Sequence, residues 1–371
     1  MTMAAPEDAA APLPVGSPGG PEVRQLALED GRKLAFACLG APLATARLKC
    51  IYYHGVPASL VEAEPLAAAA APLGIAVVAF DRPGMGGSSP HPAMSVHSVV
   101  SDAAALMSEL GLQAAVHVGE SGGAPYAAAF AALHPARTQQ LLLLAGLGPT
   151  HGREHAQLRR ALNAMDRFSM HGRKVGFSWT LNSFVKLAAN RAPRAVKAGA
   201  GSSLGPCDAR YLRENGAAKD WLVRFMQRAY QQGVRGVLGD YRVLGSDWGV
   251  DLRSIRCRAA LWHGSGDKIV PPSHSDWYRD IISDSTQTVV EGQGHISLVG
   301  RHAGAILQDA LAAAGLGHAA SAAGAAAPAA SAASAAGLTS MGSSMLSKES
   351  GQTGKEASEM DVSDVEVVGQ G

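Results

Sequence analysis

The sequence has few cysteines and almost no net charge, and each shortage excludes a class of protein. Its four cysteines are widely separated and form no CxxC pair, so we expect reduced thiols, not a disulfide framework or a metal site. A bridge between Cys38 and Cys50 stays open, because their strands could be neighbours. Lys and Arg number 32 against 31 Asp and Glu, a net charge of +1. That balance gives no basis for nucleic-acid binding.

Long apolar runs are also missing, so we expect no transmembrane segment. Residues 1–20 are rich in Ala, Pro and Gly and include Glu7 and Asp8. They lack the basic start and apolar core of a secretory signal, and they are too acidic for a typical transit peptide. We therefore predict a cytoplasmic protein with a disordered extension over residues 1–20. The low-complexity stretch 317–371 is expected to be a second disordered segment without a catalytic role.

Short apolar segments that alternate with helical runs predict an α/β fold. Strands are expected near residues 23–28, 33–39, 49–53, 75–80, 114–118 and 139–145, with a hairpin at Asp30-Gly31. This order favours a mostly parallel sheet with helices on both faces. The pattern stops after the sixth strand and resumes near Arg256. We therefore predict a core of residues 21–149 and 251–316, with a helical cap inserted at 150–250.

The most informative motif is G-E-S-G-G at residues 119–123, between an apolar strand and a helical run. A strand that passes at once into a helix needs a sharp turn, and Ser121 at its apex is expected to take a strained backbone conformation. Gly119 and Gly123 would leave room where strand and helix cross. This turn would present the Ser121 hydroxyl to a substrate. Glu120 beside it would line the pocket floor, pack in the interior or face solvent.

A serine hydroxyl needs a base to take its proton and an acid to orient that base. Asp267 follows an apolar strand at 258–262, and His295 follows another at 286–290. In open α/β sheets the functional groups gather at the carboxyl ends of the strands. Ser121, Asp267 and His295 also come in the order expected for such a fold. We predict that these three residues form the catalytic site.

Together these motifs resemble the α/β-hydrolase fold family with a helical cap. The resemblance covers roughly residues 22–315 and rests on H-G-V-P, D-R-P-G-M-G-G-S, G-E-S-G-G, W-H-G-S-G-D and G-Q-G-H, in that order. It implies an oxyanion hole made by the backbone N–H groups of Val56 and Gly122. His54 and Gly55 would then support that loop. In D-R-P-G, Asp81 and Arg82 are expected to brace loops and not to do chemistry.

The resemblance implies a hydrolase acting on a small-molecule ester or related acyl substrate, with no metal or cofactor. A serine in the elbow argues against the dehalogenase and epoxide-hydrolase branches. A ligand receptor with little turnover and an acyltransferase remain alternatives, and the sequence does not indicate the oligomeric state. Residues 151–250 carry 17 Lys and Arg against 7 Asp and Glu. This excess forms either solvated helix faces or a positive rim that attracts anions, and it fits an aminopeptidase poorly.

Overall fold

A computed structural model describes residues 2–3, 21–171 and 204–316. The predicted disordered segments 1–20 and 317–371 lie outside these ranges, except for residues 2 and 3. So do residues 172–203 of the predicted cap. None of the helices in the described ranges is long and apolar enough to cross a membrane.

The strands of the described residues form one sheet in the order β1-β9-β8-β7-β6-β4-β5-β3-β2. Their bounds are Thr2–Met3 (β1), Arg24–Ala27 (β2), Lys33–Gly40 (β3), Leu48–Tyr53 (β4), Ile75–Phe80 (β5), Ala115–Glu120 (β6), Thr138–Leu144 (β7), Ala259–Gly264 (β8) and Ser285–Val290 (β9). Strand β3 pairs antiparallel with β2 and β5, and the other pairs are parallel. The α/β fold, its mostly parallel sheet and the hairpin at Asp30-Gly31 are thus confirmed.

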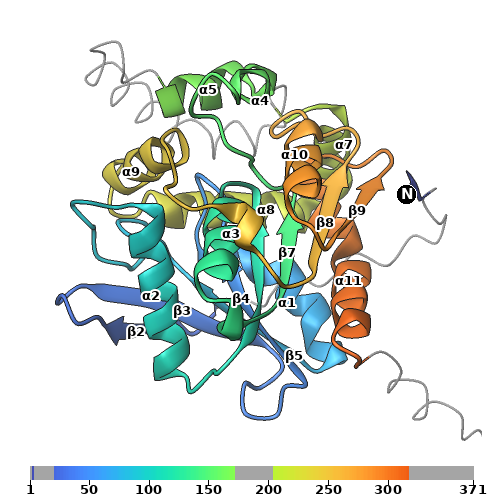
Figure 1. Ribbon diagram of the computed structural model, residues 1–371. Coiled ribbons are helices and arrows are strands. Elements are labelled where there is room, and N and C mark those ends of the chain that lie inside the picture. Colours follow the sequence, from blue (N-terminus) through green and yellow to red (C-terminus); the bar gives the residue numbers. More distant parts are fainter. Residues whose placement is uncertain (1, 4–20, 172–203, 317–371) are drawn as a thin grey trace, which may run out of the picture. The chain divides into compact units, whose positions relative to one another are not determined.

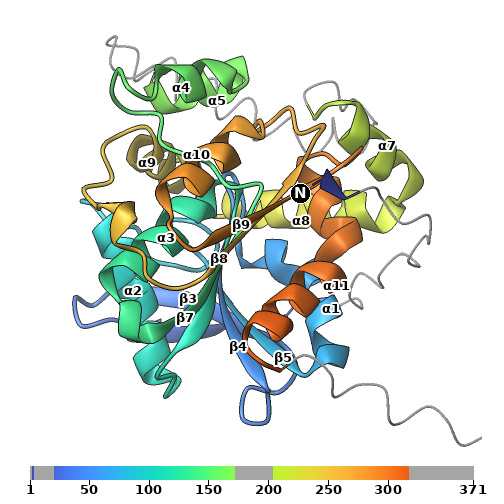
Figure 2. The same ribbon diagram turned by 45° about the vertical axis from the view of Figure 1, so that its right-hand side comes forward.

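Helices cover both faces of this sheet. The helices of the core are Glu64–Ala70 (α1), Val96–Glu109 (α2), Ala124–Leu133 (α3), Ser273–Ile281 (α10) and His295–Ala313 (α11). Helices α1 and α11 lie on one face of the sheet, and α2 and α3 lie on the other (Figure 2). Neighbouring residues of a strand point to opposite faces. In β5, Val77 therefore packs with α1 and α11, whereas Val78 packs with α2 and α3. Because both faces are covered, β5 is buried along its whole length.

A helical insertion follows β7, the sixth strand from residue 21 onward, as predicted. We call its described helices the cap: Ala156–Ala161 (α4), Ala164–His171 (α5), Pro206–Glu214 (α7), Gly216–Ala229 (α8) and Arg235–Leu244 (α9). Figure 1 shows these helices at the end of the sheet toward which β7 and β8 point. The insertion therefore lies over the edge where parallel strands gather their functional groups.

The strand order also answers the question of a disulfide. Strand β5 lies between β3, which carries Cys38, and β4, which carries Cys50. The two strands are therefore not neighbours, and both cysteines are free thiols. Burial raises the pKa of Cys50 to about 12, so this thiol stays protonated and unreactive at neutral pH.

Candidate active site

Ser121 stands in a sharp turn between β6 and α3. Strand β6 ends at Glu120, a short 3₁₀ turn covers Ser121–Gly123, and α3 begins at Ala124. The φ angle of Ser121 is +52°, a left-handed conformation that is uncommon for a residue other than glycine. The two flanking glycines are required by close approach. A Cβ at Gly119 would lie 2.6 Å from Cα of Ala124, and one at Gly123 would collide with the carbonyl oxygen of Tyr53.

Asp267 and His295 meet in the interior, although they follow different strands. Oδ2 of Asp267 lies 2.7 Å from Nδ1 of His295, and both residues are almost fully buried. Oδ1 of Asp267 accepts the backbone N–H groups of Ile269 and Val270 at 2.8 and 2.9 Å. Since an ionised carboxylate only accepts hydrogen bonds, Nδ1–H of His295 is the donor. In the neutral imidazole, Nε2 is then left as the acceptor.

The electrostatics of this pair follow from burial and mutual attraction. Burial alone would raise the pKa of Asp267, but the charge of His295 and hydrogen bonds from His263 and His295 lower it well below its ordinary value. Burial likewise opposes the charged form of His295, yet Asp267 raises the pKa of His295 to about 9. Each group thus favours the charged form of the other.

Ser121 lies at the same edge of the sheet. It follows β6, and β6, β7, β8 and β9 are successive parallel neighbours. Glu120, the residue before Ser121, contributes to the raised pKa of His295, so the imidazole lies within electrostatic range of the turn. Among the described residues no hydrogen bond joins the Ser121 hydroxyl to His295. Such contacts are often loose without substrate and tighten when it binds.

The loop after β4 lies against this turn and is held there by Arg82. The guanidinium of Arg82 donates to the carbonyl oxygens of His54 and Gly55, and the N–H of Arg82 donates to Nε2 of His54. Arg82 therefore braces this loop, as expected, and His54 is part of the brace. A Cβ added to Gly55 would lie 3.1 Å from Cβ of Ser121, so the loop touches the predicted nucleophile.

Val56 and Gly122, the two predicted oxyanion donors, are neighbours. A Cβ at Gly122 would lie 2.8 Å from Cγ1 of Val56. The N–H of Gly55 is already used, because it donates to the carboxylate of Glu62. The structure thus brings the two predicted donor residues together next to Ser121, and their role remains a prediction.

Sequence reasoning singled out Glu120 but missed Glu62, a second buried carboxylate that shares the hydroxyl of Tyr52 with it. The hydroxyl of Tyr52 donates to Glu120 and lies 3.3 Å from Oε2 of Glu62. Burial raises the pKa of Glu62 to about 7, and burial together with the charge of Glu62 raises that of Glu120 to about 8. At neutral pH the pair therefore retains protons that exposed carboxylates would lose. Glu120 packs in the interior. The burial of Glu62 could have been suspected from one feature of the sequence, a charged residue within the apolar run at 60–63.

Glu120→Gln is expected to make the protein more stable at alkaline pH. The pKa of Glu120 is raised on folding, so the folded state binds more protons between about pH 4.5 and 8 and loses stability as pH rises through that window. Glutamine keeps an acceptor for Tyr52 and does not titrate. We expect a gain on the order of 2–4 kcal/mol in the free energy of unfolding above that window. Urea denaturation at acid and alkaline pH measures it.

The matched control is Glu109→Gln, which changes an exposed carboxylate at the end of α2. It should leave the pH dependence of stability as it is. Equal pH profiles for wild type and Glu120→Gln would contradict a buried, titrating Glu120.

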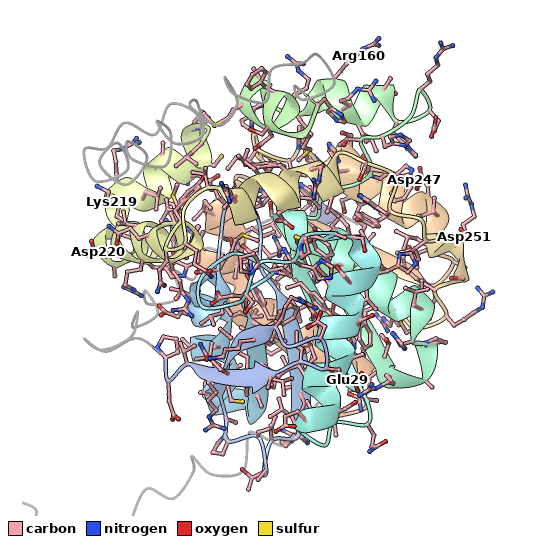
Figure 3. All side chains as sticks on the ribbon, turned by 90° about the vertical axis from the view of Figure 1, so that its left-hand side faces the viewer. Glu29, Arg160, Lys219, Asp220, Asp247 and Asp251 are labelled. Atoms are coloured by element: carbon pink, nitrogen blue, oxygen red, sulfur yellow. The ribbon has the colours of Figure 1, made fainter. Side chains whose placement is uncertain are left out.

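Part of the positive charge of the cap faces the core. Arg228 on α8 pairs with Asp81 at 2.7 Å, and Arg224 pairs with Glu64. In return, Asp240 on α9 pairs with the fully buried Arg82 of the core. Other charged side chains, such as Arg160, lie on the outer side of the cap (Figure 3). These pairs account for two of the cap's basic residues, which tie the cap to the core and do not form a free positive rim.

A surface cavity of about 390 Å³ lies between α10 and the loop at 246–253. Trp248 and Trp277 line it, and none of Ser121, Asp267 and His295 does. In the described part of the chain, no three His, Cys, Asp or Glu side chains are grouped so as to hold a metal ion.

Comparison with known proteins identifies relatives of the same fold. The profile of one family, described as the alpha/beta hydrolase fold, matches residues 51–301. A non-heme chloroperoxidase from Streptomyces lividans is 25% identical over 257 residues, which cover 67% of this chain and 85% of the relative. Among solved structures, an esterase from Exiguobacterium antarcticum gives a TM-score of 0.59 at 16% identity, covering 78% of this chain and 98% of that one. The enol-lactonase from Burkholderia xenovorans gives 0.56 at 18%, covering 79% and 100%.

Proposed function

The chain belongs to the alpha/beta hydrolase fold family, and we propose that it is a serine hydrolase that cleaves an ester or a related acyl substrate. The contact that carries the proposal is the buried hydrogen bond between His295 and Asp267. It stands at the same sheet edge as the strained turn of Ser121. A nucleophile, a base and an acid that orients the base are the three parts that acyl transfer to serine requires.

The proposed reaction proceeds through an acyl-enzyme. Nε2 of His295 takes the proton of Ser121 as Oγ attacks the acyl carbonyl carbon, and Asp267 stabilises the imidazolium that forms. The N–H groups of Val56 and Gly122 bind the developing oxyanion, an interaction typically worth about 3–4 kcal/mol for each donor removed. His295 then protonates the leaving alcohol. Water attacks the ester of Ser121, again with His295 as base, and the acid is released.

A fluorophosphonate probe and a series of nitrophenyl esters and thioesters of increasing acyl length test this function together. We expect the probe to label Ser121 and at least one member of the series to turn over. Labelling without turnover in any member would favour the ligand receptor, and acyl transfer to an added alcohol in preference to water would favour the acyltransferase. A protein that the probe does not label would contradict a serine hydrolase.

The rate is also expected to depend on pH in a defined direction. Only neutral His295 can accept the Ser121 proton, and Asp267 raises the pKa of His295 to about 9. For a neutral ester, kcat/KM should therefore rise with pH through an apparent pKa well above the usual value of about 6.5. The measurement is kcat/KM over a broad pH range at constant ionic strength. A plateau that is already complete near pH 6 would contradict a raised pKa.

A further inference from the structure

The helix that begins at the proposed base has its first backbone N–H groups bound by a side chain from a distant part of the chain. Helix α11 starts at His295, and the first N–H groups of a helix have no partner within it. Asp208 supplies one. Its Oδ2 accepts the N–H of His295 at 2.8 Å, and its Oδ1 accepts those of Ile296 and Ser297 at 3.0 and 2.9 Å. Asp208 lies on α7 of the cap and is fully buried.

We propose that Asp208 is a positioning residue for His295, through which the cap fixes the backbone of the base and places a negative charge beside its imidazole. This inference rests on the proposed function, because it takes His295 as the base. It goes beyond the set of Ser121, Asp267 and His295 by assigning a fourth functional side chain, and by drawing it from the insertion instead of the core.

The fit between α7 and the core is close enough to fix this geometry. A Cβ on Gly294 would lie 2.5 Å from the carboxylate of Asp208, and one on Gly266 would lie 2.6 Å from Sγ of Cys207. Two consecutive residues of α7 therefore contact the loops that carry His295 and Asp267. At its other end, α7 is joined to α11 by the ion pair between Glu214 and Arg301 at 2.7 Å.

Both oxygens of Asp208 accept backbone N–H groups. An ionised carboxylate can make all three of these hydrogen bonds, because it only accepts. A carboxylate is also favoured at a helix N-terminus by the partial positive charge there. Burial raises the pKa of Asp208, and the hydrogen bonds from Ser297 and His295 oppose that rise. Asp208 in turn adds to the effect of Asp267 in raising the pKa of His295.

Several other titratable groups surround His295, and a test must separate Asp208 from them. Asp267 faces it from the loop after β8, Glu120 from β6, Glu62 from the 3₁₀ turn at Leu60–Ala63, and Asp166 from α5. His263 on β8 contacts Asp267. Asp208 differs from all of these in bonding to the backbone of His295 itself. Its loss should therefore move both the position and the pKa of the imidazole.

Asp208→Asn tests the inference in the full-length chain. The amide keeps one accepting oxygen, so at least one of the three N–H groups loses its acceptor and the negative charge is removed. We expect the alkaline plateau of kcat/KM for a nitrophenyl ester to fall roughly ten- to hundredfold, because the base is misplaced. The apparent pKa of the acid limb should also fall by about one unit, because a neighbouring negative charge is lost. A variant that is merely destabilised would lower the plateau without moving the pKa.

Glu214→Gln is the matched control, since it removes another carboxylate of α7 that joins the same two helices. It should leave the plateau and the apparent pKa near those of wild type. If Asp208→Asn matched wild type in both quantities, the inference would be overturned.

NMR titration of the His295 ring in protein with ¹⁵N-labelled histidine gives a second readout that needs no turnover. The pKa of His295 should be lower in Asp208→Asn than in wild type. If Ser121 were not labelled by the probe but this shift were found, the serine-hydrolase function would fail while the contact between Asp208 and His295 stood. If the probe labels Ser121, but Asp208→Asn shifts neither the pH profile of kcat/KM nor the NMR titration of His295, the role of Asp208 alone would be refuted.

Gly294→Ala covers the case in which Asp208→Asn does not fold. It leaves the charge in place but pushes the carboxylate away from the helix, because the new Cβ would lie 2.5 Å from it. We expect the plateau to fall about tenfold. Gly304→Ala, on the same helix with open space around its Cβ, is the control and should change neither rate nor pKa. A plateau unchanged in Gly294→Ala would also count against the inference.

Discussion

Ser121→Ala is expected to abolish labelling by the fluorophosphonate and to lower kcat by on the order of 10⁶, the loss seen when the nucleophile of a serine protease is removed. The proposed reaction has no other group to form the acyl-enzyme. The fold should persist, because Ser121 already holds a φ of +52° and alanine demands nothing new of the turn. Circular dichroism and thermal denaturation should show a change in stability below about 1 kcal/mol.

Ser254→Ala is the matched control, since the Ser254 hydroxyl only closes a local turn by donating to the carbonyl of Asp251. It should be labelled and turn over as wild type does. Probe adducts found on a different serine in the Ser121→Ala protein would refute the assignment of the nucleophile.

Asp267→Asn is expected to reduce kcat by on the order of 10⁴. An amide can donate to Nδ1 of His295, which favours the tautomer whose Nε2 carries the proton and cannot accept that of Ser121. The local loop should survive, because Oδ1 of asparagine can still accept the N–H groups of Ile269 and Val270. The variant should therefore bind substrate yet turn over slowly, as steady-state and single-turnover kinetics would show.

Asp284→Asn changes an exposed carboxylate just before β9 and serves as the control with wild-type kinetics. Near-native turnover in Asp267→Asn would mean that another group orients the base.

Features that depend on local sequence could be predicted. Strand β5 is a continuous apolar run, and Asp30-Gly31 lies in the turn between β2 and β3, so the pattern of neighbouring residues was sufficient for these elements. The strained turn at Ser121 was also predictable, because a serine between glycines at a strand-to-helix junction has few alternatives. The order of strands across the sheet was not local, which is why the separation of Cys38 from Cys50 by β5 needed the structure.

Features that depend on how the cap docks could not be predicted. Asp208 and His295 are 87 residues apart, and nothing in the neighbourhood of either residue indicates the other. The same holds for Glu62, whose carboxylate is aimed at Gly55 by the fold of the chain between them. His274 on α10 gives a further example of a position that the sequence leaves open. It is fully buried and accepts the N–H of Gly148 on Nδ1, because one residue alone does not reveal which face of α10 is covered.

The buried pair between Arg82 and Asp240 has a consequence for protein engineering. The same guanidinium that meets Asp240 on α9 also holds the carbonyl groups of His54 and Gly55. Exchanging the insertion for that of a homologue without an acidic residue at this place would leave a cation buried and unmatched, a situation that typically costs about 3–5 kcal/mol. Chimeras and directed-evolution libraries of this protein should therefore keep Arg82 and Asp240 together and vary other residues to change specificity.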